Sequence, residues 1–393
     1  MYTKEQARKN SSKNITIPEG IEELEDGCFM NDDTTLESIT LPSTLKKLGD
    51  GCFLGCSFLK EVIFNGIIRE IPRHCFAYCG KLVEIRRANT MTIQGYHRFN
   101  NDGLNDVKIF GDSCFRGCSQ LEFHLPESLE KFGEYSCFDT NIEFIKIPDK
   151  IEEIPKYCFA KCRNLTHVDL NNTVKIGKNA FFNTNIVKVH FPEFIEEIGN
   201  ESFAYCHKLE DVIFDNVKSI GNYCFRDTWL SSVAFPPSLE FIGDYAFECE
   251  TLRKMIFHGK NPVNIGIGNI TSKLEKISTP MRITIPLIRL KHFTGILTID
   301  ETFAKPEANR EIKMNFIIDS VTNKEIVQKY NGDFIQRRTE NIDDCVTNIF
   351  SREDASETSA KNTNNSSRKK KLFMLICFGV TISSVIYLMN FTN

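Results

Sequence analysis

Cysteines four residues apart are the residues of this sequence with the most evident chemical potential. Cys52 and Cys56 form one such pair and Cys158 and Cys162 another, a spacing that suits a zinc site or a disulfide. Elsewhere, however, the equivalent of Cys52 and Cys158, immediately before a phenylalanine, is Ala180. Alanine cannot replace a metal ligand or a disulfide partner, but it can replace a small buried thiol. We therefore predict buried structural thiols in a reducing compartment, with disulfides or a metal site as the alternatives.

Adjacent glutamates are the second feature that could support chemistry, because paired carboxylates serve in general acid–base catalysis. The pairs are Glu22-Glu23, Glu152-Glu153 and Glu196-Glu197. The equivalent position elsewhere holds Lys46-Lys47, which indicates a solvated face. The sequence also has no metalloprotease, serine-hydrolase, phosphate-loop or dinucleotide-binding motif. We therefore expect no enzymatic activity, no cofactor and no metal; an enzyme would need a site in residues 301–350.

The charge of the chain bears on its partners. Its 48 basic and 52 acidic residues give a formal net charge of -4 at pH 7. Nucleic-acid binding requires a basic surface that displaces counterions from phosphates, so we expect no nucleic-acid partner. The polar start of the chain has no apolar core and argues against a cleaved signal peptide.

A repeating element must position the cysteines and the paired glutamates, because the chain repeats its own pattern. Ile220-Gly221 precedes Phe225 as Ile242-Gly243 precedes Phe247, and the two phenylalanines are 22 residues apart. Phenylalanines at comparable steps define landmark positions along the chain. These are Phe29, Phe53, Phe76, Phe99, Phe115, Phe138, Phe159, Phe181, Phe203, Phe225 and Phe247. A fixed period of this length is typical of a solenoid, whose units bury their apolar sides against one another.

Each unit contains a short strand followed by a corner. In Leu36-Ile39-Leu41-Pro42 the alternation predicts a strand that ends at the proline. In the following Leu45-Leu48-Gly49, glycine permits either a positive φ or a tightly packed corner. One unit is shortened, since Leu104-Val107-Ile109, which we interpret as its strand, runs directly into the next corner. The loosened unit before it would project residues 94–103, so Tyr96, His97 and Phe99 are candidates for a binding loop, with simple sequence drift as the alternative.

Three segments carry a family resemblance: LESITLPSTLKKLGDGCFLGC, IVKVHFPEFIEEIGNESFAYC and LSSVAFPPSLEFIGDYAFEC. They resemble the leucine-rich repeats of BspA-like proteins over residues 14–260. The resemblance implies an α/β-type repeat solenoid, curved, with a parallel β-sheet along one face. It also implies membership of a group known for surface proteins of bacteria and parasitic protists that bind host or matrix proteins, and it implies no enzymatic activity.

The variable strand positions of such a solenoid should form its recognition surface. The candidate protein-binding residues are Glu143, Phe144, Lys146, His167, Asp169, Lys188, His190, Asp211, Ser232, Arg253 and Lys254, to which Tyr96 and His97 of the loop are added. Their polar mixture favours a protein partner over a small apolar ligand. Trp229 lies just before a strand, and this position suits either an exposed binding contact or a packing contact.

The domain organisation follows from these patterns. We predict a polar N-terminal tail at 1–13, a solenoid of about eleven repeats at 14–260, a C-terminal cap at 261–300 and an extension of unknown role at 301–350. Within this extension we expect one strand at Lys313 to Ile318 and a short helix near Lys324 to Tyr330. A flexible basic linker at 351–371 precedes a transmembrane helix at 372–389.

The predicted membrane segment, Leu372 to Met389, contains no charged residue. As a helix it would span roughly 27 Å, enough for a thin bilayer. Arg368 and the lysines at 369–371 precede it, and four uncharged residues follow. Basic flanks favour the cytosol, so we predict a single-pass, tail-anchored protein with cytosolic repeats. A cell-surface adhesin with the repeats outside is the alternative, and it predicts glycosylated sequons and oxidised thiols.

Overall fold

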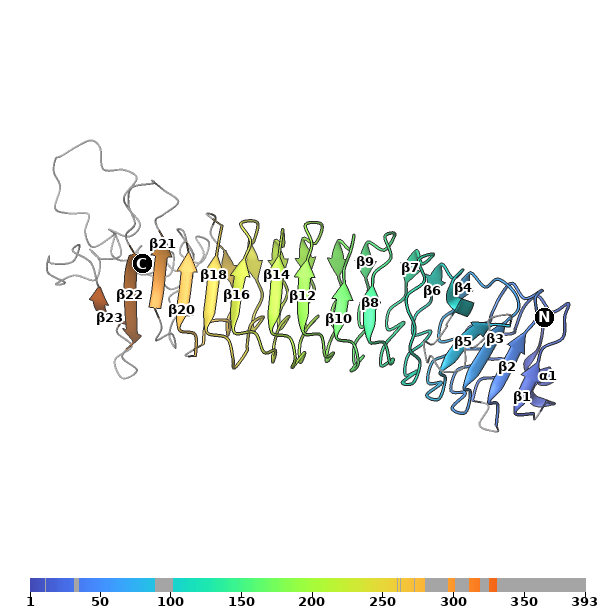
Figure 1. Cartoon of the computed structure of the whole chain (residues 1–393). Helices are drawn as coiled ribbons and strands as arrows, with labels where there is room; N and C mark the ends of the chain where they lie inside the picture. Colours follow the sequence, from blue (N-terminus) through green and yellow to red (C-terminus); the bar gives the residue numbers. More distant parts are fainter. Residues whose placement is uncertain are drawn as a thin grey trace, which may run out of the picture. The chain divides into compact units, whose positions relative to one another are not determined.

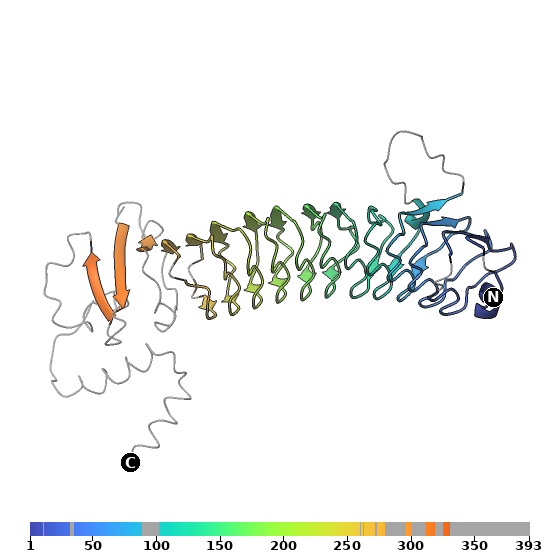
Figure 2. The same cartoon turned by 90° about the horizontal axis from the view of Figure 1, so that it is seen from below.

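The computed structural model describes residues 1–279 except 11, 32–34, 89–101, 260, 262 and 272, together with the backbone of three further strands. The chain forms two compact units, Met1–Asn269 and Ile270–Asn393. The first unit is a row of stacked coils, most of which have a longer and a shorter strand on different sides (Figure 1 and Figure 2). This confirms the predicted parallel β-solenoid.

The longer strands pair in parallel with their equivalents in neighbouring coils. They form the sheet β1-β2-β3-β5, the sheet β8-β10-β12-β14 and the pair β16-β18. Their bounds are β1 (Asn14–Thr16), β2 (Ser38–Leu41), β3 (Glu61–Phe64), β5 (Glu84–Arg87), β8 (Phe144–Lys146), β10 (His167–Asp169), β12 (Lys188–Phe191), β14 (Asp211–Phe214), β16 (Ser232–Phe235) and β18 (Lys254–Phe257). The burial of alternate residues along them places one side chain in two in the core.

The shorter strands form two further parallel sheets, β4-β6-β7 and β9-β11-β13-β15-β17-β19. They are β4 (Glu70–Ile71), β6 (Ile109–Phe110), β7 (Lys131–Phe132), β9 (Glu153–Ile154), β11 (Lys175–Ile176), β13 (Glu197–Ile198), β15 (Ser219–Ile220), β17 (Phe241–Ile242) and β19 (Asn264–Ile265). Each contributes one buried and one more exposed side chain.

The core is organised around stacked landmark phenylalanines. The ring centroids of Phe53 and Phe76 are 5.2 Å apart with an interplanar angle of 0°, and those of Phe203 and Phe225 are 5.6 Å apart at 12°. All four side chains are fully buried. Because a ring recurs at this position in most coils, the apolar surface of one coil is covered by the next, as the repeat predicted.

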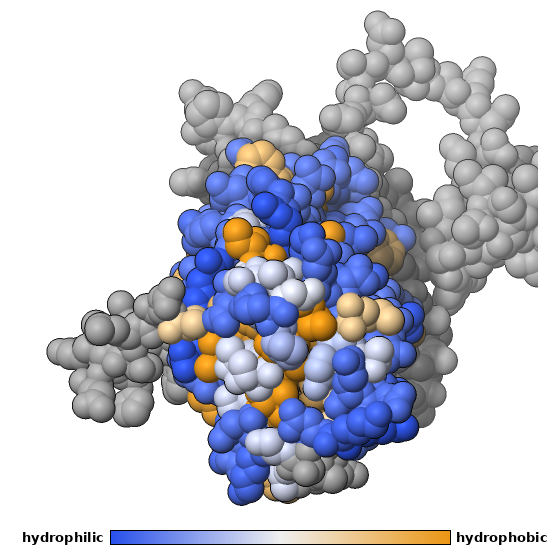
Figure 3. Space-filling model, turned by 90° about the vertical axis from the view of Figure 1, so that its right-hand side faces the viewer, coloured by the Kyte–Doolittle hydropathy of each residue, from blue (hydrophilic) through white to orange (hydrophobic). Residues whose placement is uncertain are grey.

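Residues 1–10 cover the N-terminal end of this stack, where the sequence predicted a polar tail. The ring of Tyr2 lies 6.0 Å from that of Phe29. Helix α1 (Lys4–Arg8) begins after Thr3, whose hydroxyl accepts a hydrogen bond from the Gln6 backbone amide, and it buries Ala7. Figure 3 views this end, where apolar patches are interrupted by polar side chains.

The corner glycines are required by close packing. A Cβ atom on Gly49 would lie 2.5 Å from the backbone nitrogen of Asp26, and one on Gly243 would lie 2.5 Å from that of Asn222. The positive φ falls two residues after the corner glycine, on residues such as Tyr245 with a φ of 54°. Of the two predicted reasons for glycine, tight packing is therefore correct.

One coil is much longer than the others, which corrects the predicted repeat count. The rings of Phe76 and Phe115 stack directly, 5.7 Å apart at 3°, so no coil lies between them. The longer strand of this coil is β5, and Ile109–Phe110 form its shorter strand β6, which pairs with β4. The interpretation of Leu104-Val107-Ile109 as the longer strand was wrong, and residues 102–104 form the 3-10 turn η1 (Asp102–Leu104). Tyr96, His97 and Phe99 lie outside the described residues.

A second correction concerns Phe138. The amide of Cys137 donates to the Cys158 carbonyl at 3.0 Å, as the amide of Phe115 donates to the Ser136 carbonyl. Cys137 is therefore the landmark residue of its coil and is fully buried, whereas Phe138 is only half-buried.

The second unit contains β20 (Lys276–Thr279), β21 (Ile296–Asp300), β22 (Glu311–Ile318) and β23 (Glu325–Tyr330). β20 pairs with β21 in parallel, and β21, β22 and β23 form an antiparallel meander. The predicted strand at Lys313 to Ile318 lies within β22, and the short helix expected near Lys324 to Tyr330 is instead a strand. The predicted membrane span, 372–389, lies outside the described residues. Of the helical segments that are described, none has the length and hydropathy to cross a bilayer.

Candidate protein-binding surface

The longer strands β8 to β18 place most of the candidate residues on one exposed face. Phe144 aligns with His167, His167 with Lys188, and Lys188 with Asp211. On the same strands, the buried neighbours of these residues point into the core. One row of the face therefore presents an aromatic ring, an imidazole, an ammonium group and a carboxylate side by side.

A second row runs parallel to the first, two residues further along each strand. Lys146 aligns with Asp169, and His190 aligns with Ile213. In the next pair of strands Ser232 aligns with Lys254 and Ala234 with Ile256. Strand β16 lies beside β14, which continues the face (Figure 1). Glu143 and Arg253, the remaining described candidates, immediately precede β8 and β18.

Two pairs of polar side chains on this face are formed by exposed residues. The Lys188 Nζ lies 2.6 Å from the Asp211 carboxylate, and the His190 Nε2 lies 2.8 Å from that of Asp215. Lys188 and Asp211 are each more than half exposed. Exposed pairs of this kind contribute about 1 kcal/mol or less. A partner can therefore exchange them for its own contacts at little cost.

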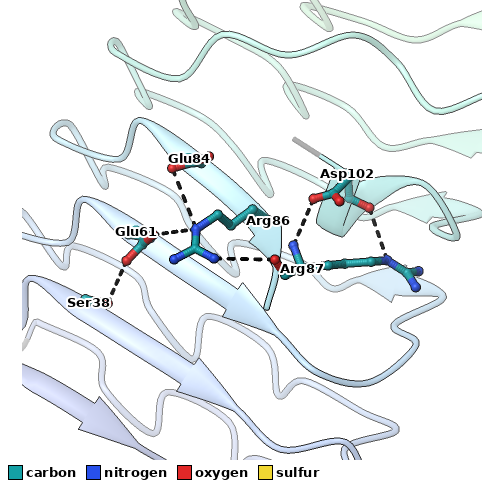
Figure 4. A network of polar contacts seen from close by, with 6 residues as sticks. All are labelled: Ser38, Glu61, Glu84, Arg86, Arg87 and Asp102. Carbon is teal, nitrogen blue, oxygen red and sulfur yellow. Dashed lines mark hydrogen bonds and ion pairs between the residues drawn. The ribbon is translucent and has the colours of Figure 1, made fainter. Parts of the chain in front are cut away.

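The corresponding face of β2, β3 and β5 is occupied by its own contacts (Figure 4). The Arg86 Nε lies 2.6 Å from the Glu61 carboxylate, which also accepts a hydrogen bond from the Ser38 hydroxyl at 3.1 Å. Burial raises the pKa of Glu84 beside them. The Asp102 carboxylate accepts a hydrogen bond from the Arg87 amide at 2.8 Å. This half of the longer-strand surface is thus less available to a partner than the half from β8 to β18.

The sequence analysis missed the exposed apolar residues of the face. Ile213 is 40% exposed, and Ala234 and Ile256 occupy the same outward row. They were overlooked because apolar residues in strands were assigned to the core. The signal was positional, since Ile213 lies two residues after the outward Asp211. Trp229, at the edge of this face, is 57% exposed, which agrees with the exposed one of its two predicted settings.

The cysteines are structural thiols, as predicted. Within the described part of the chain all of them are free and buried. The Cys162 thiol donates to the Cys137 carbonyl of the preceding coil at 3.1 Å, and the Cys206 thiol donates to the Phe181 carbonyl at 3.2 Å. Burial raises the pKa of Cys162 to about 12. These thiols therefore join neighbouring coils and are poor nucleophiles.

The acidic pairs form a solvated face, which also agrees with the prediction. Glu22 pairs with Lys46 at 2.8 Å, Glu153 with Lys175 at 3.3 Å and Glu196 with Lys218 at 2.7 Å. Each ion pair joins two neighbouring coils on the surface. No cluster of metal-binding side chains occurs among the residues that the structure describes.

Comparisons with known proteins place the chain in a family. The model of the BspA type leucine-rich repeat region matches in six copies over residues 5–105, 102–210 and 196–315. Similar solved structures include a leucine-rich repeat protein from Bacteroides ovatus, 19% identical over 68% of this chain and 86% of that one, with a TM-score of 0.39. A leucine-rich cell surface protein from Faecalibacterium prausnitzii is 20% identical over 70% and 77%, with a TM-score of 0.40. A leucine-rich repeat protein from Eubacterium ventriosum is 18% identical over 73% and 81%, with a TM-score of 0.46. A search of the curated proteins found no match. On the repeat pattern and the family match, this chain belongs to the BspA-type leucine-rich repeat family.

Proposed function

We propose that this protein is a non-enzymatic binding module that holds a partner protein on the exposed face of β8 to β18. The observation that carries the proposal is the alignment of unlike side chains in two rows on a fixed backbone. Phe144, Lys188 and Asp211 are exposed, while the residue that follows each of them in its strand is buried (Ile145, Val189 and Val212). Rigid presentation reduces the entropy lost when a partner binds.

The composition of the face suits a protein partner. Trp229 and Ile213 provide exposed apolar surface, and Lys188 and Asp211 provide charges of both signs nearby. Protein interfaces commonly combine a central apolar or aromatic anchor with a polar rim. We infer that Trp229, Ile213 and Ile256 supply the anchor and that the ion-paired residues set specificity.

The binding face can be tested with two matched lysines. Lys188 lies on the proposed face and Lys175 on the shorter-strand face; each side chain is 55% exposed, and each is paired with a carboxylate of a neighbouring coil. A photo-crosslinking residue at position 188 should trap the partner in cells, and one at position 175 should not. With the partner identified, Lys188→Glu should weaken binding by about tenfold or more, and Lys175→Glu by less than about twofold. Equal effects of the two substitutions would reject this face.

The membrane setting is part of the same proposal. Leu372 to Met389 would anchor the chain, and the basic residues before it favour cytosolic repeats. The chain's resemblance to a family known for surface proteins favours the other arrangement, an adhesin with its repeats outside. Protease protection of an epitope tag at residue 1 distinguishes them. Digestion only after the plasma membrane is permeabilised supports the cytosolic scaffold, whereas digestion on intact cells supports the adhesin.

A further inference from the structure

Phe138 reaches the surface because Cys137 takes its place in the core, and two cations gather at its ring. The guanidinium carbon of Arg116, in the preceding coil, lies 5.0 Å from the ring centroid. The Nζ of Lys161, in the following coil, lies 5.5 Å from the same centroid. Both distances are within the range of cation–π attraction. The three residues lie in the turns that follow the shorter strands, away from the proposed protein-binding face.

Neither cation forms an ion pair within the described part of the chain. The aromatic contacts of Arg116 are with Tyr78, Tyr135 and Phe138, at 5.7, 5.0 and 5.0 Å. Its Nε is buried without a hydrogen-bond partner among those residues. A buried donor of this kind is uncommon in folded proteins. Two positive charges on either side of one ring, neither of them in an ion pair, also attract an external anion.

A second arginine in the same repeat position provides the contrast. Arg226 lies between Tyr205 and Tyr223, at 5.8 and 5.5 Å, much as Arg116 lies between its own tyrosines. The Arg226 Nε, also without a well-aligned hydrogen bond, is 3.0 Å from the Glu248 carboxylate. Counted from the corner glycine of each coil, Phe138 stands where Glu248 stands. The coil of Phe138 therefore lacks the carboxylate that neutralises the equivalent arginine.

We propose that Arg116 and Lys161 form a binding site for an acidic peptide segment, with carboxylates on the two cations and Phe138 between them. The planar guanidinium matches a carboxylate in geometry, and its stacking on aromatic rings holds its orientation. The cations lie two coils apart, or roughly 10 Å at the usual strand spacing. In an extended peptide, acidic residues three positions apart span about the same distance.

The surrounding charges favour a peptide over a nucleic acid. Asp112, Glu134 and Asp139 occupy neighbouring turns, and Glu134 lies 3.7 Å from the Nζ of Lys156. These carboxylates would repel a continuous phosphate backbone, which gains affinity from unbroken basic surface. A short segment with spaced carboxylates can reach the two unpaired cations and avoid the acids.

The test uses the full chain and a fluorescein-labelled eight-residue peptide with glutamates three positions apart. Binding is measured by fluorescence anisotropy at low salt, and the control peptide has glutamine in place of each glutamate. Arg116→Gln and Lys161→Gln should each weaken binding about tenfold, the loss expected for one charge-assisted contact. Arg226→Gln removes the same charge from the matched, already paired position and should change affinity less than about twofold. Thermal unfolding of each variant verifies the fold.

Three results would overturn the proposal. One is equal binding of the glutamate and glutamine peptides by the native chain. Another is an equal loss of affinity in Arg116→Gln and Arg226→Gln, which would indicate an effect of net charge alone. The third is an oligonucleotide that binds more tightly than the peptide and displaces it, which would assign the site to nucleic acid.

Discussion

The ring of Phe76 stacks on that of Phe115, 5.7 Å away, although the segment between them is nearly twice the length of an ordinary coil. The Phe76 amide also donates to the Cys114 carbonyl at 2.8 Å. Both of these contacts between the coils are made by residues outside 89–101. The two sides of that segment lie close together, because the Arg87 amide donates to the Asp102 carboxylate at 2.8 Å.

We therefore predict that a short Gly-Ser-Gly linker can replace residues 89–101. The stack and the pairing of β4 with β6 do not use this segment, and shortening a loop changes its closure entropy only slightly. Thermal unfolding followed by circular dichroism should remain cooperative, with the midpoint within about 5 °C of the original. A broad or multiphasic transition would show that the segment contributes to the core.

The corrected position of Phe138 predicts unequal effects of two phenylalanine substitutions. Phe159→Ala removes a fully buried ring from the stack and should lower the free energy of unfolding by about 3–5 kcal/mol. Phe138→Ala removes a half-buried ring on the surface and should cost about 1 kcal/mol.

Urea denaturation of the two variants measures the difference. Phe159 is the appropriate reference because it is the landmark residue of the coil that directly follows the coil of Phe138. Equal losses of stability would mean that Phe138 belongs to the core and that the assignment of Cys137 is incorrect.

Two errors of the sequence analysis, the landmark position given to Phe138 and the extra repeat counted at Phe99, have specific physical causes. Cys137 and Phe138 are adjacent and both are apolar, so side-chain type alone did not decide which enters the core. The distance from the corner glycine did contain the answer: Phe115 follows Gly111 by four residues, whereas Phe138 follows Gly133 by five. Phe99 lies 23 residues after Phe76, close to the repeat spacing, so the single long coil was counted as two repeats.

Other features were predictable because they recur at fixed positions. The inward stripes, the buried thiols and the ion-paired acidic face follow from the types of residue that share one position of the repeat. The outward positions of Lys188 and Asp211 followed from the alternation of a strand. The cap formed by Tyr2 and α1 was missed because it occurs once and has no repeat to reveal it.

Close packing at the corner predicts that Gly243→Ala is strongly destabilising. The added Cβ would lie 2.5 Å from the Asn222 backbone nitrogen, so two coils would have to separate. We expect a loss of about 2–4 kcal/mol in urea denaturation, comparable to other severe packing defects.

Gly80→Ala is the matched control for this substitution. Its Cβ would meet no atom closer than the Gly117 carbonyl oxygen at 4.0 Å. Its stability should change by less than about 1 kcal/mol. If the two variants are equally stable, close approach of the coils is not the reason for glycine at position 243.

Burial of the thiols predicts that the protein loses stability in alkaline solution. Burial raises the pKa of Cys206 to about 11 from its usual 9.0, and that of Cys224 to about 12. At a pH between the usual pKa of 9.0 and the raised pKa of each thiol, the unfolded chain releases the thiol proton while the folded chain retains it. The unfolded state then binds fewer protons, so the free energy of unfolding falls as the pH rises above about 9.

The measurement is the urea midpoint at pH 8 and at pH 10 under reducing conditions. The midpoint of the native chain should be lower at pH 10. Cys206→Ala removes one titrating group from a position where other coils hold threonine, such as Thr184 and Thr228, and it should reduce the pH dependence. Cys345→Ala, which removes a thiol outside the solenoid, serves as the comparison. If Cys206→Ala has the same pH dependence as the native chain, the Cys206 thiol is not what weakens the fold in alkali.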